Sequence, residues 1–152
     1  MAVEAPTHLF PYTQQILFAL IPVGATVVCH GVGMAVVRRH YRRFAPHLLQ
    51  NAGNSLARTF FMIAIVALML LTHFAEVIIW AMFYLAMGLL ASTQEAMYYS
   101  MEYYTTLAIS VHKLAGTWAG FGGFESMTAM LMFGWSTAVL AAVVQKLHSI
   151  DE

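Results

Sequence analysis

The chain has very little charge: only 9% of its 152 residues are Asp, Glu, Lys or Arg, and seven acidic residues balance seven basic ones. Soluble domains carry about 25% charged residues, so this chain has too few charges to cover a water-facing surface. This scarcity excludes an ordinary soluble enzyme, a disordered chain and an electrostatic nucleic-acid binder. Cysteine is nearly absent too, and the single Cys29 cannot form an intrachain disulfide, so cysteine usage does not indicate the redox compartment.

Apolar residues, by contrast, make up 61% of the chain and gather in long runs. Three runs are long enough to cross a bilayer as helices: 14–37, 59–90 with Glu76 as its only charge, and 126–145. The first eleven residues lack the basic start of a secretory signal, so we expect the first run to remain in the mature protein. The sequence therefore predicts an all-α integral membrane protein that is not an enzyme.

Basic residues are concentrated between the first two runs, where five of the seven lie between Arg38 and Arg58. The positive-inside rule makes this segment a cytoplasmic loop. We therefore expect a multi-pass protein of the cell inner (plasma) membrane, with the N-terminus outside and the C-terminus cytoplasmic. The loop could bind a partner protein, and the predicted division is a module at 1–58 followed by one at 59–152.

A shorter element is predicted between the last two runs. Ser92 and Glu95 fit a helix N-cap followed by a capping-box glutamate. The helix after them is about ten residues long, which is too short to span a membrane. It is either a re-entrant pore helix or an amphipathic helix that lies on the membrane surface.

Several motifs between residues 71 and 144 resemble the tetrameric potassium-channel superfamily, in particular small bacterial members with two pore-forming spans and an extra leading span. The matching features lie on the expected outer helix, pore helix, filter and inner helix. They are His73-x-x-Glu76, Trp80-Ala81, Ala96-x-Tyr98, Ser100, Tyr104-Thr105-Thr106-Leu107, Trp118, Glu125 and Phe133-Gly134-Trp135-Ser136-Thr137.

The resemblance implies a homotetramer embedded in membrane lipid, in which each chain contributes three transmembrane helices and a re-entrant pore helix. It also implies site residues of three kinds. The filter would be Thr105, Thr106, Leu107, Ala108, Ile109 and Ser110; the filter would be supported by Glu102, His73, Glu76 and Glu125; the cavity and gate would include Met130, Gly134 and Thr137. No cofactor is expected, apart from monovalent cations in the pore.

The filter departs from the family pattern Thr-x-Gly-Tyr-Gly-Asp, because Ala108, Ile109, Ser110 and Val111 replace both glycines, the aromatic and the acidic residue. A residue with a Cβ costs about 1–2 kcal/mol in the left-handed conformation that glycine adopts freely. We therefore predict a cation pore with altered or poor potassium selectivity. The first alternative is a non-conducting structural or accessory subunit that keeps the pore fold, and the second, less favoured one is a metal-binding membrane protein.

Three further groups have more than one interpretation. Glu102 would lack the family's aspartate partner, so it either pairs with Lys113 or His112 or is a protonated hydrogen-bonding residue. His73 and Glu76 share a helix face and could ligate a metal, but two ligands do not make a site, so we expect a buried polar pair that holds the outer helix to the pore helix. Glu125 could join that pair. The eleven methionines indicate packing rather than copper binding.

Overall fold

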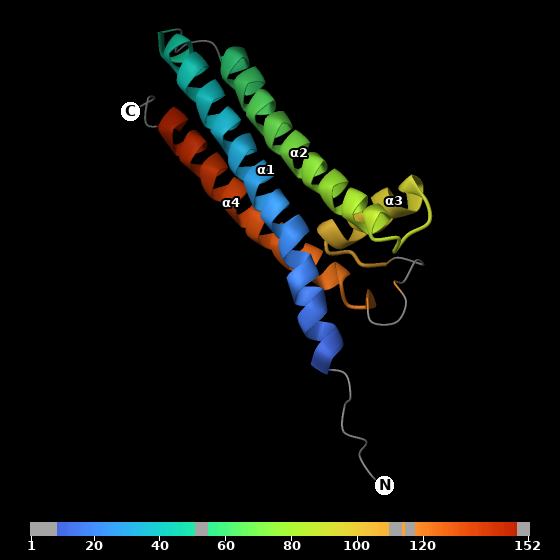
Figure 1. Ribbon diagram of the computed structural model, residues 1–152. Helices are drawn as coiled ribbons and strands as arrows, with labels where there is room; N and C mark the ends of the chain where they lie inside the picture. Colours follow the sequence, from blue (N-terminus) through green and yellow to red (C-terminus); the bar gives the residue numbers. More distant parts are fainter. Residues whose placement is uncertain (1–8, 51–54, 110–113, 115–117, 149–152) are drawn as a thin grey trace. The chain divides into compact units, whose positions relative to one another are not determined.

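The computed structural model describes residues 9–50, 55–109, 114 and 118–148, and Figure 1 shows the helices that these residues form. The helices are α1 (Leu9–Gln50), α2 (Ser55–Ala86), α3 (Thr93–Tyr104) and α4 (Gly122–His148), and the described residues include no strand. Three helices are long and apolar enough to cross a membrane, over Thr13–Pro46, Leu56–Ala86 and Gly122–Leu147. The prediction of an all-α chain is thus confirmed over the described residues, and the three long apolar helices support a multi-pass membrane protein.

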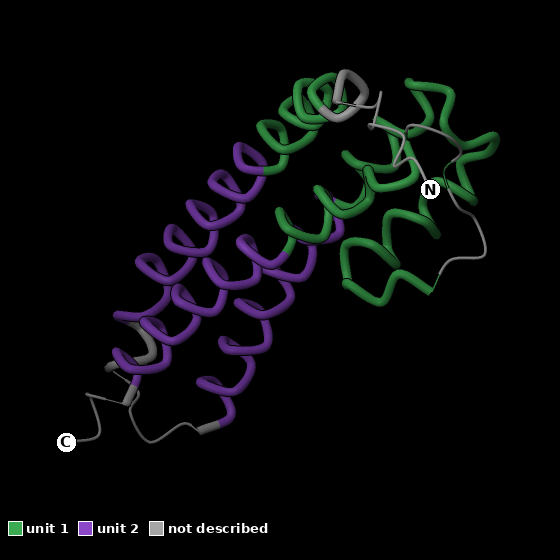
Figure 2. The backbone as a smooth tube through the Cα atoms, turned by 90° about the horizontal axis from the view of Figure 1, so that it is seen from below, with its two compact units in different colours: residues 1–26, 77–129 green, residues 27–76, 130–152 purple. Residues whose placement is uncertain are grey.

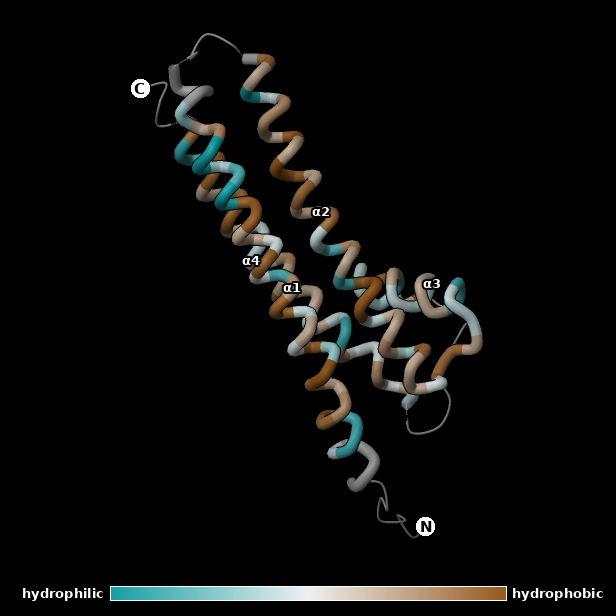
Figure 3. The backbone as a smooth tube through the Cα atoms, turned by 45° about the horizontal axis from the view of Figure 1, so that its top comes forward, coloured by the Kyte–Doolittle hydropathy of each residue, from teal (hydrophilic) through white to brown (hydrophobic). Residues whose placement is uncertain are grey.

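The basic segment differs from the prediction. It was expected to be a loop that starts at Arg38, but α1 continues as a helix to Gln50. Arginine and leucine favour helix almost as much as alanine does, and no proline interrupts α1 between Pro22 and Pro46. In Figure 3 hydrophilic residues accordingly colour the C-terminal part of α1. Hydropathy marks the expected bilayer boundary, but α1 continues beyond it, and beyond Pro46, to Gln50.

The chain forms two compact units, which are coloured separately in Figure 2. Unit 2 consists of residues 27–76 and 130–152, and unit 1 consists of residues 1–26 and 77–129. The core of unit 2 is made by side chains of α1, α2 and α4. Its buried members are Met34, Val37, Phe61, Ile65, Met69, Val143 and Leu147. In this unit α1 and α2 approach closely, because a Cβ at Gly33 would lie only 2.9 Å from the Cβ of Thr72.

The core of unit 1 is aromatic. Its fully buried rings are Trp80, Tyr84, Tyr99, Tyr104 and Phe121. The Tyr84 and Tyr99 rings meet edge to face at 5.0 Å, so the buried face of α3 packs against α2. Burial raises the pKa of Tyr99 above its usual value, which keeps this phenol neutral. Gly122 at the start of α4 leaves room for the Tyr103 ring, which a Cβ at that position would overlap.

Candidate functional site

The short helix α3 begins as predicted. Ser92 is its N-cap, with an extended backbone (φ −135°, ψ 154°), and its Oγ accepts a hydrogen bond from the Glu95 amide at 3.2 Å. The Glu95 carboxylate turns back to accept a hydrogen bond from the Ala91 amide at 3.2 Å. These two bonds satisfy amides at the helix start that would otherwise have no partner.

A buried polar cluster attaches α3 to its neighbours in unit 1. The Ser100 hydroxyl donates to the Val77 carbonyl of α2 at 2.9 Å and lies 2.5 Å from Oε1 of Glu125 on α4. The Tyr84 hydroxyl of α2 donates to the other Glu125 oxygen at 2.6 Å. Glu125 has no solvent exposure, so this carboxyl joins three helices. The described partners of Glu125 are therefore Ser100 and Tyr84, rather than the His73–Glu76 pair that the sequence suggested.

The backbone after α3 alternates in handedness. Thr106 and Ala108 have positive φ angles of 62° and 47°, which non-glycine residues rarely adopt. The amides of Leu107 and Ala108 both donate to the Glu102 carbonyl, at 2.9 and 3.2 Å. No backbone amide of the described residues donates to the carbonyls of residues 105–108.

The predicted filter residues are exposed in the single chain as far as they are described. Residues 105–109 are all exposed, and the apolar side chains of Leu107 and Ile109 keep 63% and 73% of their surface accessible. Ser110 lies outside the described residues. A polar backbone and two apolar side chains in the same short segment form an uncovered surface in the isolated chain.

Glu102, the predicted support behind the filter, is half-buried on α3. Its Oε2 atom is buried, and within the described part of the chain it has no hydrogen-bond partner. Both proposed partners, His112 and Lys113, lie outside the described residues, so the pairing stays a prediction.

The predicted cavity and gate residues, Met130, Gly134 and Thr137, lie along one face of α4 at i, i+4 and i+7. All three are exposed in the single chain, and a Cβ at Gly134 would meet no atom within 4 Å. This face of α4 is free to contact either lipid or another chain.

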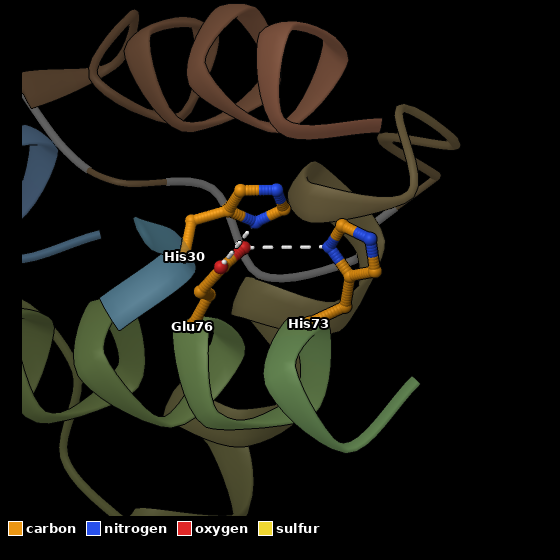
Figure 4. Close-up of side chains that lie close together, drawn as sticks. All are labelled: His30, His73 and Glu76. Carbon is orange, nitrogen blue, oxygen red and sulfur yellow. Dashed lines mark hydrogen bonds and ion pairs between the residues drawn. The ribbon is translucent and has the colours of Figure 1, made fainter. Parts of the chain in front are cut away.

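The second polar cluster lies within unit 2 and contains a residue that the sequence did not indicate. Nδ1 of His30 on α1 lies 2.8 Å from Oε1 of Glu76 on α2. Nδ1 of His73, one turn before Glu76, lies 3.4 Å from the other carboxylate oxygen. Figure 4 shows the Glu76 carboxylate between the two imidazole rings. The side chains of His30 and Glu76 have no solvent exposure, and that of His73 keeps 12%.

The far nitrogens of both imidazoles lie near one hydroxyl. Oγ of Ser136 on α4 is 3.0 Å from Nε2 of His73 and 3.4 Å from Nε2 of His30. The Ser136 hydroxyl is also directed at the Met34 sulfur, at 4.0 Å. The ring of Trp135 packs beside His30 with the centroids 5.1 Å apart. The expected His73–Glu76 pair therefore contacts α1 and α4 through His30 and Ser136.

Local spacing revealed His73 and Glu76, because residues three apart share a helix face. His30 is 43 residues before His73, and nothing in the local sequence relates it to them. A weak signal was available: His30 is the only ionisable residue besides Cys29 in the 14–37 run, and ionisable residues inside a membrane span are rarely without function.

No protein-family model, curated protein or solved structure matches this chain significantly.

Proposed function

We propose that this chain is one subunit of a homotetrameric, channel-like pore of the cell inner membrane that passes monovalent cations with altered potassium selectivity. Three features support the proposal: two spanning helices, α2 and α4, a 12-residue helix between them, and a non-helical segment that follows it. The functional class comes from the resemblance of residues 71–144 to the potassium-channel superfamily.

The observation that carries the proposal is the backbone after α3. A selectivity filter coordinates dehydrated cations with rings of carbonyl oxygens. Among the described residues no backbone amide donates to the carbonyls of residues 105–108, and these are the carbonyls that would coordinate the ion. The left-handed conformations of Thr106 and Ala108 match the alternation that points successive carbonyls to one side. The C-terminal end of α3 adds roughly half a negative charge near this segment, which favours a cation.

A single chain would supply only part of the coordination shell, so the function requires several copies around one axis. The exposed Leu107 and Ile109 side chains and the exposed α4 face with Gly134 are surfaces that neighbouring copies could cover. The N-terminus is then outside and the basic end of α1 is cytoplasmic, as the positive-inside rule predicts.

A non-conducting accessory subunit is the second candidate, and Ala108 supports it. Its left-handed conformation costs about 1–2 kcal/mol in every subunit. Four such costs around one axis favour a filter that is distorted or occluded.

Ion flux into liposomes tests the pore. We expect vesicles that contain the purified full-length protein to show potassium and sodium flux, and we expect Thr106→Trp to abolish it by filling the pathway. The matched control is Leu20→Trp on α1, an apolar position with 59% exposure far from α3 in sequence, which should conduct like the parent.

Native mass spectrometry of the same preparation should show four chains. Vesicles that stay tight for both ions at every pH tested, with the tetramer present, would favour the accessory subunit. Flux that survives Thr106→Trp would contradict the assigned pathway, and dimers or monomers as the only species would contradict the pore itself.

A further inference from the structure

We propose that His30, His73 and Glu76 form a binding site for one divalent transition-metal ion, with zinc as the best fit. The three residues come from two helices, and one potential ligand atom from each lies within 4.8 Å of the other two. The site lies within the candidate membrane spans, and none of its three residues belongs to the proposed cation pathway at residues 105–110.

The distances suit a tetrahedral ion. Zinc binds imidazole nitrogens and carboxylate oxygens at about 2.0–2.2 Å, which places neighbouring ligand atoms about 3.3–3.5 Å apart. The 3.4 Å between His73 Nδ1 and Glu76 Oε2 already has this value. His30 Nδ1 contacts the other carboxylate oxygen, Oε1, at 2.8 Å, and this contact needs to open by about 0.5–0.7 Å. A zinc ion held by one oxygen of Glu76 also needs the carboxylate to turn, so that both rings reach the same ion.

Hydrogen bonding by Ser136 orients both rings. A hydroxyl oxygen accepts two hydrogen bonds and donates one. Ser136 can donate to the Met34 sulfur, so both of its acceptor positions are then open to the Nε2–H groups of His30 and His73. With Nε2 protonated, each ring directs the lone pair of Nδ1 towards Glu76. Histidine ligands of metals are commonly oriented by a hydrogen bond of this kind from the other ring nitrogen.

In this tautomer two nitrogen lone pairs face one carboxylate, and each of the three groups is a hydrogen-bond acceptor. Such groups repel one another unless a positive charge lies between them. Either a proton or a metal ion can supply that charge. A metal ion contacts all three groups at once, whereas one proton joins only two of them. The convergence of three ligand atoms therefore favours the metal.

The chemistry of the ligands narrows the choice of ion. Two imidazoles and one carboxylate suit zinc and other first-row transition metals, whereas magnesium and calcium prefer oxygen ligands only. The cluster in the described residues offers three ligands, so the fourth tetrahedral position is left for water. A bound ion would also tie α1 to α2, since His30 lies on one helix and the other two ligands lie on the next.

Zinc binding to the full-length protein in detergent tests the site without any measurement of flux. The protein is stripped with a chelator and loaded with zinc, and bound metal is counted by mass spectrometry. Competition with a chromophoric chelator gives the affinity. Cobalt in place of zinc should give the visible absorption of a tetrahedral site. We expect one zinc per chain and a rise in thermal stability that increases with zinc concentration.

Three substitutions and one control separate the site from its surroundings. His30→Gln and Glu76→Gln remove ligands and should weaken zinc binding by more than about 100-fold, since loss of an outer partner alone costs about 10–100-fold. Ser136→Ala removes only the outer hydrogen-bond partner of the two rings, so zinc binding should weaken by only about 10–100-fold. His40→Gln is the control, because His40 is on α1 in the same unit and packs against Phe44 and Phe61.

Circular dichroism confirms that each variant is folded before its metal is counted. Equal zinc affinity of His40→Gln and His30→Gln would overturn the proposal. So would a parent protein that binds no stoichiometric zinc and shows stability that depends on pH alone, because a proton would then occupy the site. Should Glu76→Gln fail to fold, His30→Gln decides by itself.

Discussion

The separation of α1 and α2 in unit 2 should control the geometry of the His30 cluster, and Gly33→Ala tests this. Gly33 lies one turn after His30 and faces Thr72, the residue before His73. A Cβ at position 33 would lie 2.9 Å from the Thr72 Cβ and would overlap the Thr72 hydroxyl and methyl. Carbon atoms pack at about 3.5–4.0 Å, so the two helices must separate by roughly 1 Å.

The magnitude follows from three effects. Overpacking of this kind costs about 1–3 kcal/mol, and alanine recovers about 1 kcal/mol because it favours helix over glycine. An added 1 Å would lengthen the 2.8 Å contact between His30 and Glu76 beyond hydrogen-bonding distance, which costs about 1–3 kcal/mol for a buried pair. We expect a net loss of about 1–5 kcal/mol of stability, centred near 3 kcal/mol.

Unfolding in mixed detergent micelles, followed by circular dichroism, measures this loss, and zinc affinity should fall in the same variant. Gly24→Ala is the matched control on α1, because a Cβ there meets no atom within 4 Å and helix propensity alone should apply. Adding Thr72→Gly to Gly33→Ala removes the overlapping atoms and should restore zinc binding. If Gly33→Ala and Gly24→Ala are equally stable, the close approach does not exist as described.

Three further predictions concern unit 1. Glu125→Ala leaves the Ser100 and Tyr84 hydroxyls without this partner, and chemical unfolding should show a loss of about 2–4 kcal/mol of stability. Glu125→Gln keeps both contacts and should cost less than about 1 kcal/mol. Equal losses in the two variants would show that the carboxyl is not the shared partner of the two hydroxyls. Ser92→Ala should cost about 0.5–2 kcal/mol, and hydrogen exchange should detect faster opening of the first turn of α3, an effect that Ser92→Asp should not produce. Ala108→Gly removes the steric cost of the left-handed conformation and should raise the melting temperature, by an amount that corresponds to at most about 1 kcal/mol of stability. A lower melting temperature would contradict the positive φ of residue 108.

Much of the fold follows from local sequence. The three spans were predictable because an apolar run of about 20 residues has few stable environments outside a bilayer. The start of α3 was predictable because Ser92 and Glu95 complete a cap within four residues. The continuation of α1 past Arg38 was missed, because hydropathy reports the preferred surroundings of a residue and not whether its backbone stays helical.

The candidate metal site was predictable only in part. The spacing of His73 and Glu76 is a property of one helix, so the sequence shows it directly. The approach of His30 depends on the register between α1 and α2, and the close contact of Gly33 with Thr72 is one of the contacts that contribute to it. A register between helices is the sum of many contacts, and no short motif encodes it.

The contact of Trp135 with His30 gives the buried cluster its own optical signal. The two rings lie 5.1 Å apart, close enough for the indole to respond to any charge that reaches the imidazole. An ion with a partly filled d shell, such as cobalt, would quench the fluorescence of Trp135. Zinc, with a full d shell, would change this fluorescence only through its charge. Comparison with Trp135→Phe isolates this indole from the other two tryptophans, so the native chain reports the occupancy of the cluster without a label.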